Sequence, residues 1–229
     1  MAIKPILFNT EMVRAILDGR KDATRRIVKG FIPDDAVWGY TAFTPKGYIS
    51  CRGTFADGYG EKFFKLPCEP GDILYVRETW QYLYELDGNE QIIEDTGKYY
   101  YAATDTISFN TYVDENGLEH EHVPWKPSIH MPKEAARIWL KVMDVRVERL
   151  QEITDNECIK EGIYPSNCRD CNDIFGCDVC PDEGYDEVDM FVEVWNSTIK
   201  KSNLNRYGWD ANPWVWVIEF ERCEKPEGV

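Results

Sequence analysis

The chain has 229 residues, of which 43% are hydrophobic, and its formal net charge is −15. A chain of this length can bury one sizeable core, and no run of about 18 uncharged apolar residues predicts a membrane span. The acidic balance excludes a protein that coats nucleic acid through bulk positive charge. Because the N-terminal residues lack the order of charged and apolar residues typical of a secretory signal, we expect one cytoplasmic domain with no membrane partner.

A strand and a helix are predicted at the start of the chain. Residues 4–8 predict a short strand, and apolar side chains recur at helical spacing over residues 12–17. Thr10 is the expected N-cap of this helix, and Gly19 is its expected end. Residues 30–68 are rich in Gly, Pro and aromatic residues without clean periodicity, so we expect a hairpin or a long loop there.

The segment around the end of this helix is locally basic. Residues 14–29 hold six basic and two acidic side chains, although the whole chain is acidic. Such a segment is a candidate contact for the phosphates of a nucleic acid. The structural alternative is that cations after a helix C-terminus favour the helix dipole and that arginines bridge surface carboxylates.

The middle of the chain alternates predicted strands with polar stretches. Residues 73–80 have the apolar, β-rich composition of a buried strand. A polar insertion at residues 85–122 surrounds a Tyr-rich strand at residues 98–103. Apolar residues then alternate from Ile138 to Val147, with one shift of parity that a bulge or bend would require.

The last part of the chain predicts two helices and a central strand. Thr154 and Glu157 have the spacing of a capping box, and Gly162 closes the short helix that they begin. Residues 188–199 predict the second helix, and residues 213–220 are apolar on both faces, as in a doubly covered strand. The sequence therefore predicts an α+β fold, a small strand-dominated barrel or curled sheet with about three helices.

Four cysteines form a candidate metal site inside a polar insertion at residues 164–184. They are Cys168, Cys171, Cys177 and Cys180, in the pattern C-x2-C-x5-C-x2-C. Four thiolates in a tetrahedral array suit a closed, structural zinc site, so we expect a zinc knuckle. Two short disulfides and an iron–sulfur cluster are the alternatives that the same four residues leave open.

Four stretches of the chain resemble the ASCH family, whose fold is similar to the PUA domain of RNA-modifying proteins. The stretches are ILFNTEMVRAILDGRKDATRR, PGDILYVRETW, KPSIHMPKEAARIWLKVMDVRVERLQEITDNECIKEGI and YGWDANPWVWVIEFERC. They are most similar to a longer, often phage-encoded branch of that family. The resemblance implies a PUA-like β-barrel that recognises RNA or a modified nucleoside, with the zinc knuckle and the 85–122 insertion outside the common core.

The same resemblance implies a catalytic set. Small bacterial members include an amidohydrolase that removes the acetyl group of N4-acetylcytidine with a lysine, a threonine and a glutamate. The matching positions are Lys21 and Thr24, in a Gly-x-Lys-x-x-Thr arrangement that begins at Gly19, and Glu161. A desolvated lysine can take the threonine proton, and the glutamate can orient the lysine or donate to the leaving amine. Asp22 stands where the family usually has threonine. The structural alternative for Glu161 is a surface glutamate on a short helix.

Further charged residues are candidates for contact with a nucleoside or nucleic acid around this site. They are Arg20, Arg25, Arg26, Arg77, Glu78 and His130. The expected function is the binding of RNA or a modified nucleoside, in phage or prophage biology. The alternatives are an amidohydrolase that acts on N4-acylated cytidine, and a phage accessory protein that binds a host protein through its acidic face.

Overall fold

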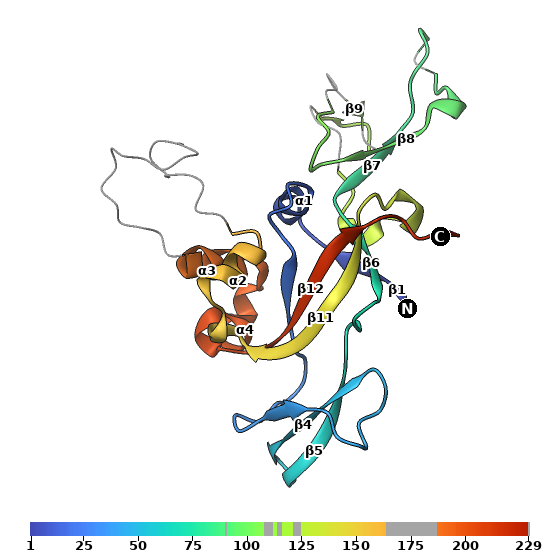
Figure 1. Cartoon of the computed structure of the whole chain (residues 1–229). Helices are drawn as coiled ribbons and strands as arrows, with labels where there is room; N and C mark the ends of the chain where they lie inside the picture. Colours follow the sequence, from blue (N-terminus) through green and yellow to red (C-terminus); the bar gives the residue numbers. More distant parts are fainter. Residues whose placement is uncertain (90, 108–111, 114–115, 121–124, 164–186, 229) are drawn as a thin grey trace, which may run out of the picture. The chain divides into compact units, whose positions relative to one another are not determined.

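The computed structural model describes residues 1–89, 91–107, 112–113, 116–120, 125–163 and 187–228 (Figure 1). The α-helices of this part of the chain are α1 (Thr10–Leu17), α2 (Asp155–Lys160), α3 (Glu187–Thr198) and α4 (Leu204–Tyr207). The strands are β1 (Ile3–Leu7), β2 (Ala23–Ile27), β3 (Val37–Gly39), β4 (Tyr48–Phe55), β5 (Gly58–Lys65), β6 (Ile73–Arg77), β7 (Trp80–Leu83), β8 (Lys98–Tyr101), β9 (Tyr112–Val113), β10 (Glu119–His120), β11 (Trp139–Arg149) and β12 (Trp214–Cys223).

The fold is a mixed α+β fold made mostly of strands, which confirms the α+β part of the predicted fold class. The hydrogen-bonded strand orders are β1-β6-β11-β12-β2, β3-β4-β5, β7-β8 and β9-β10. Among the residues described above, these strands form no closed barrel. In the same residues, no helix is long and apolar enough to cross a membrane.

The chain divides into two compact units, and each unit combines three separate segments. Unit 1 consists of residues 1–2, 19–72 and 141–221. Unit 2 consists of residues 3–18, 73–140 and 222–229. The two units are described separately below.

In unit 1, the strand pair β2–β12 carries the helices α2 and α3. The two strands run antiparallel, with Ala23 opposite Glu219 and Ile27 opposite Val215. Val215 is fully buried and packs in one apolar cluster with Phe191 and Trp195 of α3. Apolar side chains at helical spacing in α3 therefore form the cover of this sheet face, as the sequence predicts.

The short helix α2 begins and ends where the sequence predicts. The Thr154 side chain and Glu157 form a capping box at its first turn. Glu161 is the C-cap, and Gly162 follows with a φ of 87°. This left-handed conformation favours glycine and turns the chain away from the helix axis. The helix therefore ends with the side chain of Glu161 at a defined position.

Residues 37–65 of unit 1 form a three-stranded antiparallel sheet, where the sequence predicts only a hairpin or a long loop. In β4, Ile49, Cys51 and Phe55 alternate as buried residues. Trp38 of β3 lies on the same face and packs edge-on against Trp214, with ring centroids 5.6 Å apart. Alternation is clear in β4, but β5 has exposed residues on both faces, which explains why its sequence gives no strand pattern.

In unit 2, helix α1 begins one residue earlier than the sequence predicts. The Asn9 side chain, not that of Thr10, accepts the N–H of Met12 at 2.8 Å and caps the helix. Both residue types are good caps, so the sequence leaves this boundary open by one residue. The predicted strand before it is β1, which pairs parallel with β6.

In unit 2, the Tyr-rich strands β7 and β8 pack against an apolar cluster. Trp80, Met131 and Trp139 are buried in this cluster. Tyr82 and Tyr99 lie opposite each other in this strand pair, with ring centroids 4.7 Å apart. Tyr99, which lies within the predicted 85–122 insertion, thus packs against Tyr82 and extends the core.

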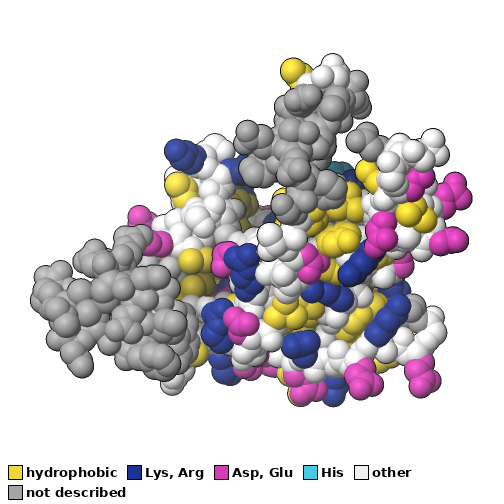
Figure 2. All heavy atoms as spheres, turned by 90° about the horizontal axis from the view of Figure 1, so that it is seen from above, with side chains coloured by type: hydrophobic (Ala, Val, Ile, Leu, Met, Phe, Trp, Pro, Cys, Tyr) yellow, Lys and Arg dark blue, Asp and Glu magenta, His cyan; other side chains and the backbone are white. Residues whose placement is uncertain are grey.

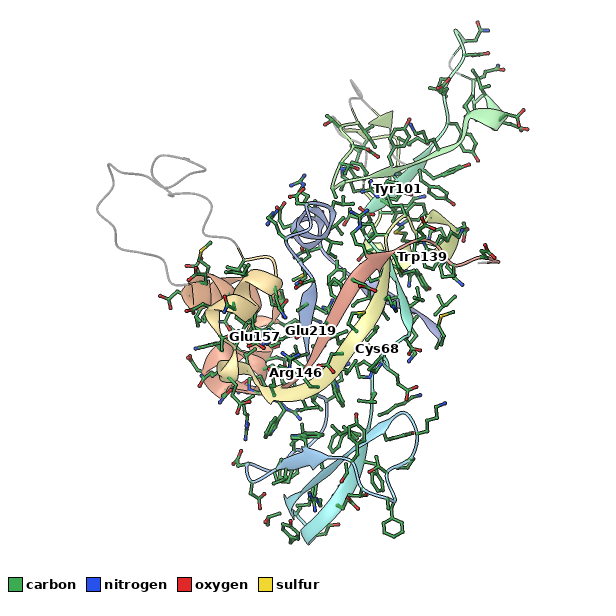
Figure 3. All side chains as sticks on the ribbon, viewed as in Figure 1. Cys68, Tyr101, Trp139, Arg146, Glu157 and Glu219 are labelled. Atoms are coloured by element: carbon green, nitrogen blue, oxygen red, sulfur yellow. The ribbon has the colours of Figure 1, made fainter. Side chains whose placement is uncertain are left out.

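The isolated cysteines behave as small apolar residues, as the sequence predicts. Cys51, Cys68 and Cys158 are buried, and Cys223 is half-buried. Burial raises the pKa of the Cys51 thiol to about 11, so this side chain stays protonated at neutral pH. Figure 3 labels Cys68.

Candidate functional site

The candidate site of unit 1 forms where the chain enters β2 and where α2 ends. Lys21 and Glu161 face each other in an isolated antiparallel bridge. The Asp22 N–H donates to the Lys160 carbonyl at 2.9 Å, so the edge of β2 is hydrogen bonded to the end of α2. This main-chain contact brings together two side chains that lie 140 positions apart in the sequence.

Lys21 and Glu161 form a buried ion pair. The Lys21 Nζ donates to Glu161 Oε2 at 2.6 Å and to the Glu161 main-chain oxygen at 2.7 Å. The two side chains are only 1% and 6% exposed. Burial lowers the pKa of Lys21, because the charge of Glu161 raises it by less than the loss of hydration lowers it. Lys21 is therefore easier to deprotonate than an ordinary lysine.

Arg25 of β2, four residues after Lys21, also binds Glu161. Its Nη1 lies 3.4 Å from Glu161 Oε1, and its Nη2 lies 3.2 Å from Glu157 and 3.5 Å from Glu148. The side chain is 1% exposed, and its Nε–H has no acceptor among the residues of known position. Arg25 was a candidate for phosphate contact, but its charge is committed to three carboxylates inside the unit.

Arg146 of β11 extends the network to the solvent side. It donates to Glu157 at 2.6 Å and to Glu219 at 2.6 Å, and it also contacts Glu148. Figure 3 shows Arg146, Glu157 and Glu219 gathered where β11, β12 and α2 meet. Glu157 therefore connects Arg146 to Arg25, which in turn contacts the Lys21–Glu161 pair.

We expect this network to make stability depend on acid pH. Burial opposes ionisation of Glu157 and Glu219, but hydrogen bonds and positive charges, Arg146 among them, outweigh it and lower the pKa of both carboxyls. A lowered folded-state pKa stabilises the fold above the ordinary glutamate value of 4.5, and this contribution is lost as pH falls through the lowered values. Denaturant unfolding from neutral to acid pH should therefore show a shallower acid loss in Arg146→Met than in wild type. Equal slopes in the two proteins would contradict the network.

Thr24, the third member of the candidate catalytic set, is buried in β2 at 2% exposure. Thr24 lies opposite Ile218, and Arg25 lies opposite Val217. Because side chains alternate along a strand, Thr24 shares its face with Arg26 and lies on the face opposite to Arg25. The structure thus brings Lys21 and Glu161 into contact, whereas the strand directs Thr24 away from the face on which Arg25 meets Glu161.

Arg20 and Arg26 are the half-buried cations of the basic segment. Arg20 Nη1 donates to the Gly162 carbonyl at 3.3 Å, next to the end of α2. Burial lowers the pKa of the Arg26 guanidinium, and Glu161 opposes this effect. Both arginines therefore lie within the electrostatic reach of the Lys21–Glu161 pair.

The remaining charged candidates lie in unit 2. Arg77 Nε donates to the Met131 carbonyl at 2.7 Å, and His130 is exposed on a short 3-10 turn. Glu78, a candidate for ligand contact in the sequence analysis, is 1% exposed and is held by Arg137 through two bonds of 2.9 Å. Arg137 also lies 4.0 Å above the Tyr101 ring. The sequence gives no signal for Arg137, because its partner lies 59 positions away.

The four cysteines of the predicted zinc knuckle lie outside the described residues, as does the 164–184 insertion that carries them. Within the described ranges, no group of three or more His, Cys, Asp or Glu side chains is placed to hold a metal ion. The zinc site therefore stays a prediction from the cysteine spacing.

Comparisons of the chain with protein-family models, with curated proteins and with solved structures gave no significant match. The functional argument therefore depends on the chemistry of the residues above. On the face drawn in Figure 2, Lys and Arg side chains are interspersed with Asp and Glu. This mixed surface is compatible with a local contact to a charged ligand.

Proposed function

We propose that the chain is a PUA-like protein of the ASCH type, and that the Lys21–Glu161 end of unit 1 binds a modified nucleoside or a segment of RNA. The observation that carries the proposal is the buried contact of 2.6 Å between Lys21 and Glu161. A lysine of lowered pKa beside a carboxylate is typical of functional sites, because burying two charges costs stability that a purely structural contact need not spend.

The pair has the hydrogen-bonding groups that a cytosine ring requires. A glutamate accepts from the exocyclic N4 of cytosine, and a lysine donates to an acceptor oxygen. Arg20 and Arg26, both half-buried, would add positive charge for a phosphate. A site of this kind favours cytidine over uridine, because uridine presents an oxygen to the Glu161 carboxylate where cytidine presents a donor.

Calorimetric titration with cytidine, N4-acetylcytidine and uridine tests this proposal. We expect binding of at least one cytidine derivative, weaker binding of uridine, and loss of binding in Glu161→Gln. Glu227→Gln, at an exposed position, is the matched control and should bind as wild type does. Equal affinity for cytidine and uridine, or binding unchanged in Glu161→Gln, would show that the pair is a structural contact only.

The lowered pKa of Lys21 favours a second candidate, an amidohydrolase that acts on N4-acylated cytidine. The strand β2 directs Thr24 to its other face, so water is the nucleophile that this geometry favours. Neutral Lys21 would take a proton from this water, which attacks the acyl carbonyl, and the tetrahedral adduct would release the acid and the cytidine amine, which leaves with that proton. Release of acetate from N4-acetylcytidine, lost in Lys21→Ala but kept in Thr24→Val, would support this reaction. Loss of hydrolysis in a folded Thr24→Val variant would assign the nucleophile to Thr24 instead.

We also propose that Cys168, Cys171, Cys177 and Cys180 bind one structural zinc ion. Four thiolates leave no open position, so the ion would supply folding stability to the insertion and no catalytic step. We expect one zinc per chain by elemental analysis, and loss of this zinc in the Cys168→Ser, Cys171→Ser double variant. The Cys51→Ser variant, which changes a cysteine outside the cluster, should keep it. Absence of zinc together with iron in the purified protein would favour the cluster alternative instead.

A further inference from the structure

Exposed aromatic side chains are concentrated in one short part of unit 1. Five of them, at 39–83% exposure, lie between residues 31 and 63, whereas Tyr84 of unit 2 is a sixth at 42%. The five are Phe31, Tyr40, Phe43, Tyr59 and Phe63. Only those rings that share one face of the unit can form a common binding surface.

The strand register places two of these rings on the outward face of the β3–β4–β5 sheet. Tyr59 lies opposite Thr54, and Phe63 lies opposite Ser50. The other face of β4 carries the buried Ile49, Cys51 and Phe55. Tyr59 and Phe63 are four residues apart on one strand, and thus roughly 13 Å apart on the same face.

Basic side chains share this outward face. Arg52 of β4 and Lys65 of β5 are exposed there, opposite Glu61 and Tyr48 respectively. The Glu61 carboxylate accepts the Ser50 hydroxyl and lies opposite Arg52 in the strand register. Residues 29–65 hold five basic and four acidic side chains, in a chain of net charge −15. This segment therefore lacks the acidic excess of the chain.

We infer that the outward face of the β3–β4–β5 sheet binds single-stranded nucleic acid. Bases stack on the Tyr59 and Phe63 rings, a phosphate between them contacts Arg52, and a phosphate beyond Phe63 contacts Lys65. Stacking on aromatic rings tolerates any sequence, since every base has a π face, and a paired duplex cannot offer its bases in this way. This face is built from other residues than the Lys21–Glu161 site, so it binds a strand whether or not that site binds a nucleoside.

Fluorescence anisotropy of a labelled oligouridine of about twelve nucleotides tests the inference, with oligodeoxythymidine and an RNA duplex of the same length as further probes. We expect both single strands to bind and the duplex to bind more weakly. Tyr59→Ala and Phe63→Ala should each weaken binding about tenfold, a loss within the range of single-ring contributions. Tyr84→Ala is the control for an exposed tyrosine.

A second pair of variants tests the contribution of the Arg52 charge to binding. Arg52→Gln should weaken binding and reduce its salt dependence, whereas Lys62→Gln should have a smaller effect. Lys62 is the matched control because it lies on β5 with its Nζ 4.2 Å above the Phe55 ring, on the face opposite to Tyr59. Failure of wild type to bind any single strand, or equal losses in Tyr59→Ala and Tyr84→Ala, would overturn the inference. So would a wild-type dimer that Tyr59→Ala dissociates, because the face would then bind a second copy.

Discussion

Glu161→Ala is expected to lower the free energy of unfolding by about 3–5 kcal/mol, because it leaves the buried charges of Lys21 and Arg25 without their shared carboxylate. The Lys21 side chain is 1% exposed, so water cannot replace the lost partner. Burial already lowers the pKa of Lys21 against the opposing charge of Glu161, and removing that charge lowers it further. A lowered lysine pKa costs stability at neutral pH, and the cost disappears as pH rises to the ordinary value of 10.5. The loss in the variant should therefore shrink in alkali.

Urea unfolding at neutral and alkaline pH measures this effect. Glu227→Gln, at an exposed position, should stay within about 0.5 kcal/mol of wild type at both pH values. Pairing Glu161→Ala with Lys21→Met separates the two charges, since the double variant should be less destabilised than the sum of the single variants. A Glu161→Ala protein as stable as wild type would show that the ion pair does not exist in solution.

Arg137→Met is expected to lower the free energy of unfolding by a similar amount, about 3–5 kcal/mol, because it leaves the Glu78 carboxylate buried in unit 2 without its cation. Glu78 is 1% exposed and receives two bonds of 2.9 Å from Arg137. Methionine keeps the apolar part of the side chain against Tyr101, so the change removes mainly the charge and its bonds. Thermal unfolding followed by circular dichroism should show a marked decrease in the midpoint.

Two further variants sharpen this test. Arg137→Lys keeps the charge but not the two-pronged geometry, so its loss should lie between wild type and Arg137→Met. Lys200→Met, at an exposed position of unit 1, controls for removal of a surface cation. If Arg137→Met and Lys200→Met unfold alike, the Glu78–Arg137 pair contributes nothing to stability.

Local signals in the sequence predict several element boundaries. The Thr154–Glu157 capping box and the glycines at positions 19 and 162 stand where the structure ends or begins a helix. The predicted parity shift is also present in β11, where Leu140 and Val142 are buried and the next buried residue is Val145. These features are set by neighbouring residues, so a single sequence contains them.

Contacts between residues far apart in the chain could not be predicted from the sequence. Arg25 looked like an exposed cation of a basic segment, but three glutamates from distant positions surround it. Glu78 is a sequence-based candidate for ligand contact, but its buried carboxylate binds Arg137. Strand alternation predicts which residues share a face, but not which carboxylates the fold will bring to that face. The ASCH resemblance supplied the Lys21–Glu161 pairing, and the fold shows the contact.

The measurement that tests the central claim most directly is the titration of Lys21 by NMR, with the lysine Cε labelled, in the presence and absence of N4-acetylcytidine. The account predicts a Lys21 pKa below the ordinary value of 10.5 in the free protein, and a change in its signal on addition of the nucleoside. Glu161→Gln should shift the Lys21 titration further down, since the raising charge is lost. A Lys21 that titrates as an ordinary surface lysine and does not respond to the nucleoside would contradict both the buried pair and its proposed role.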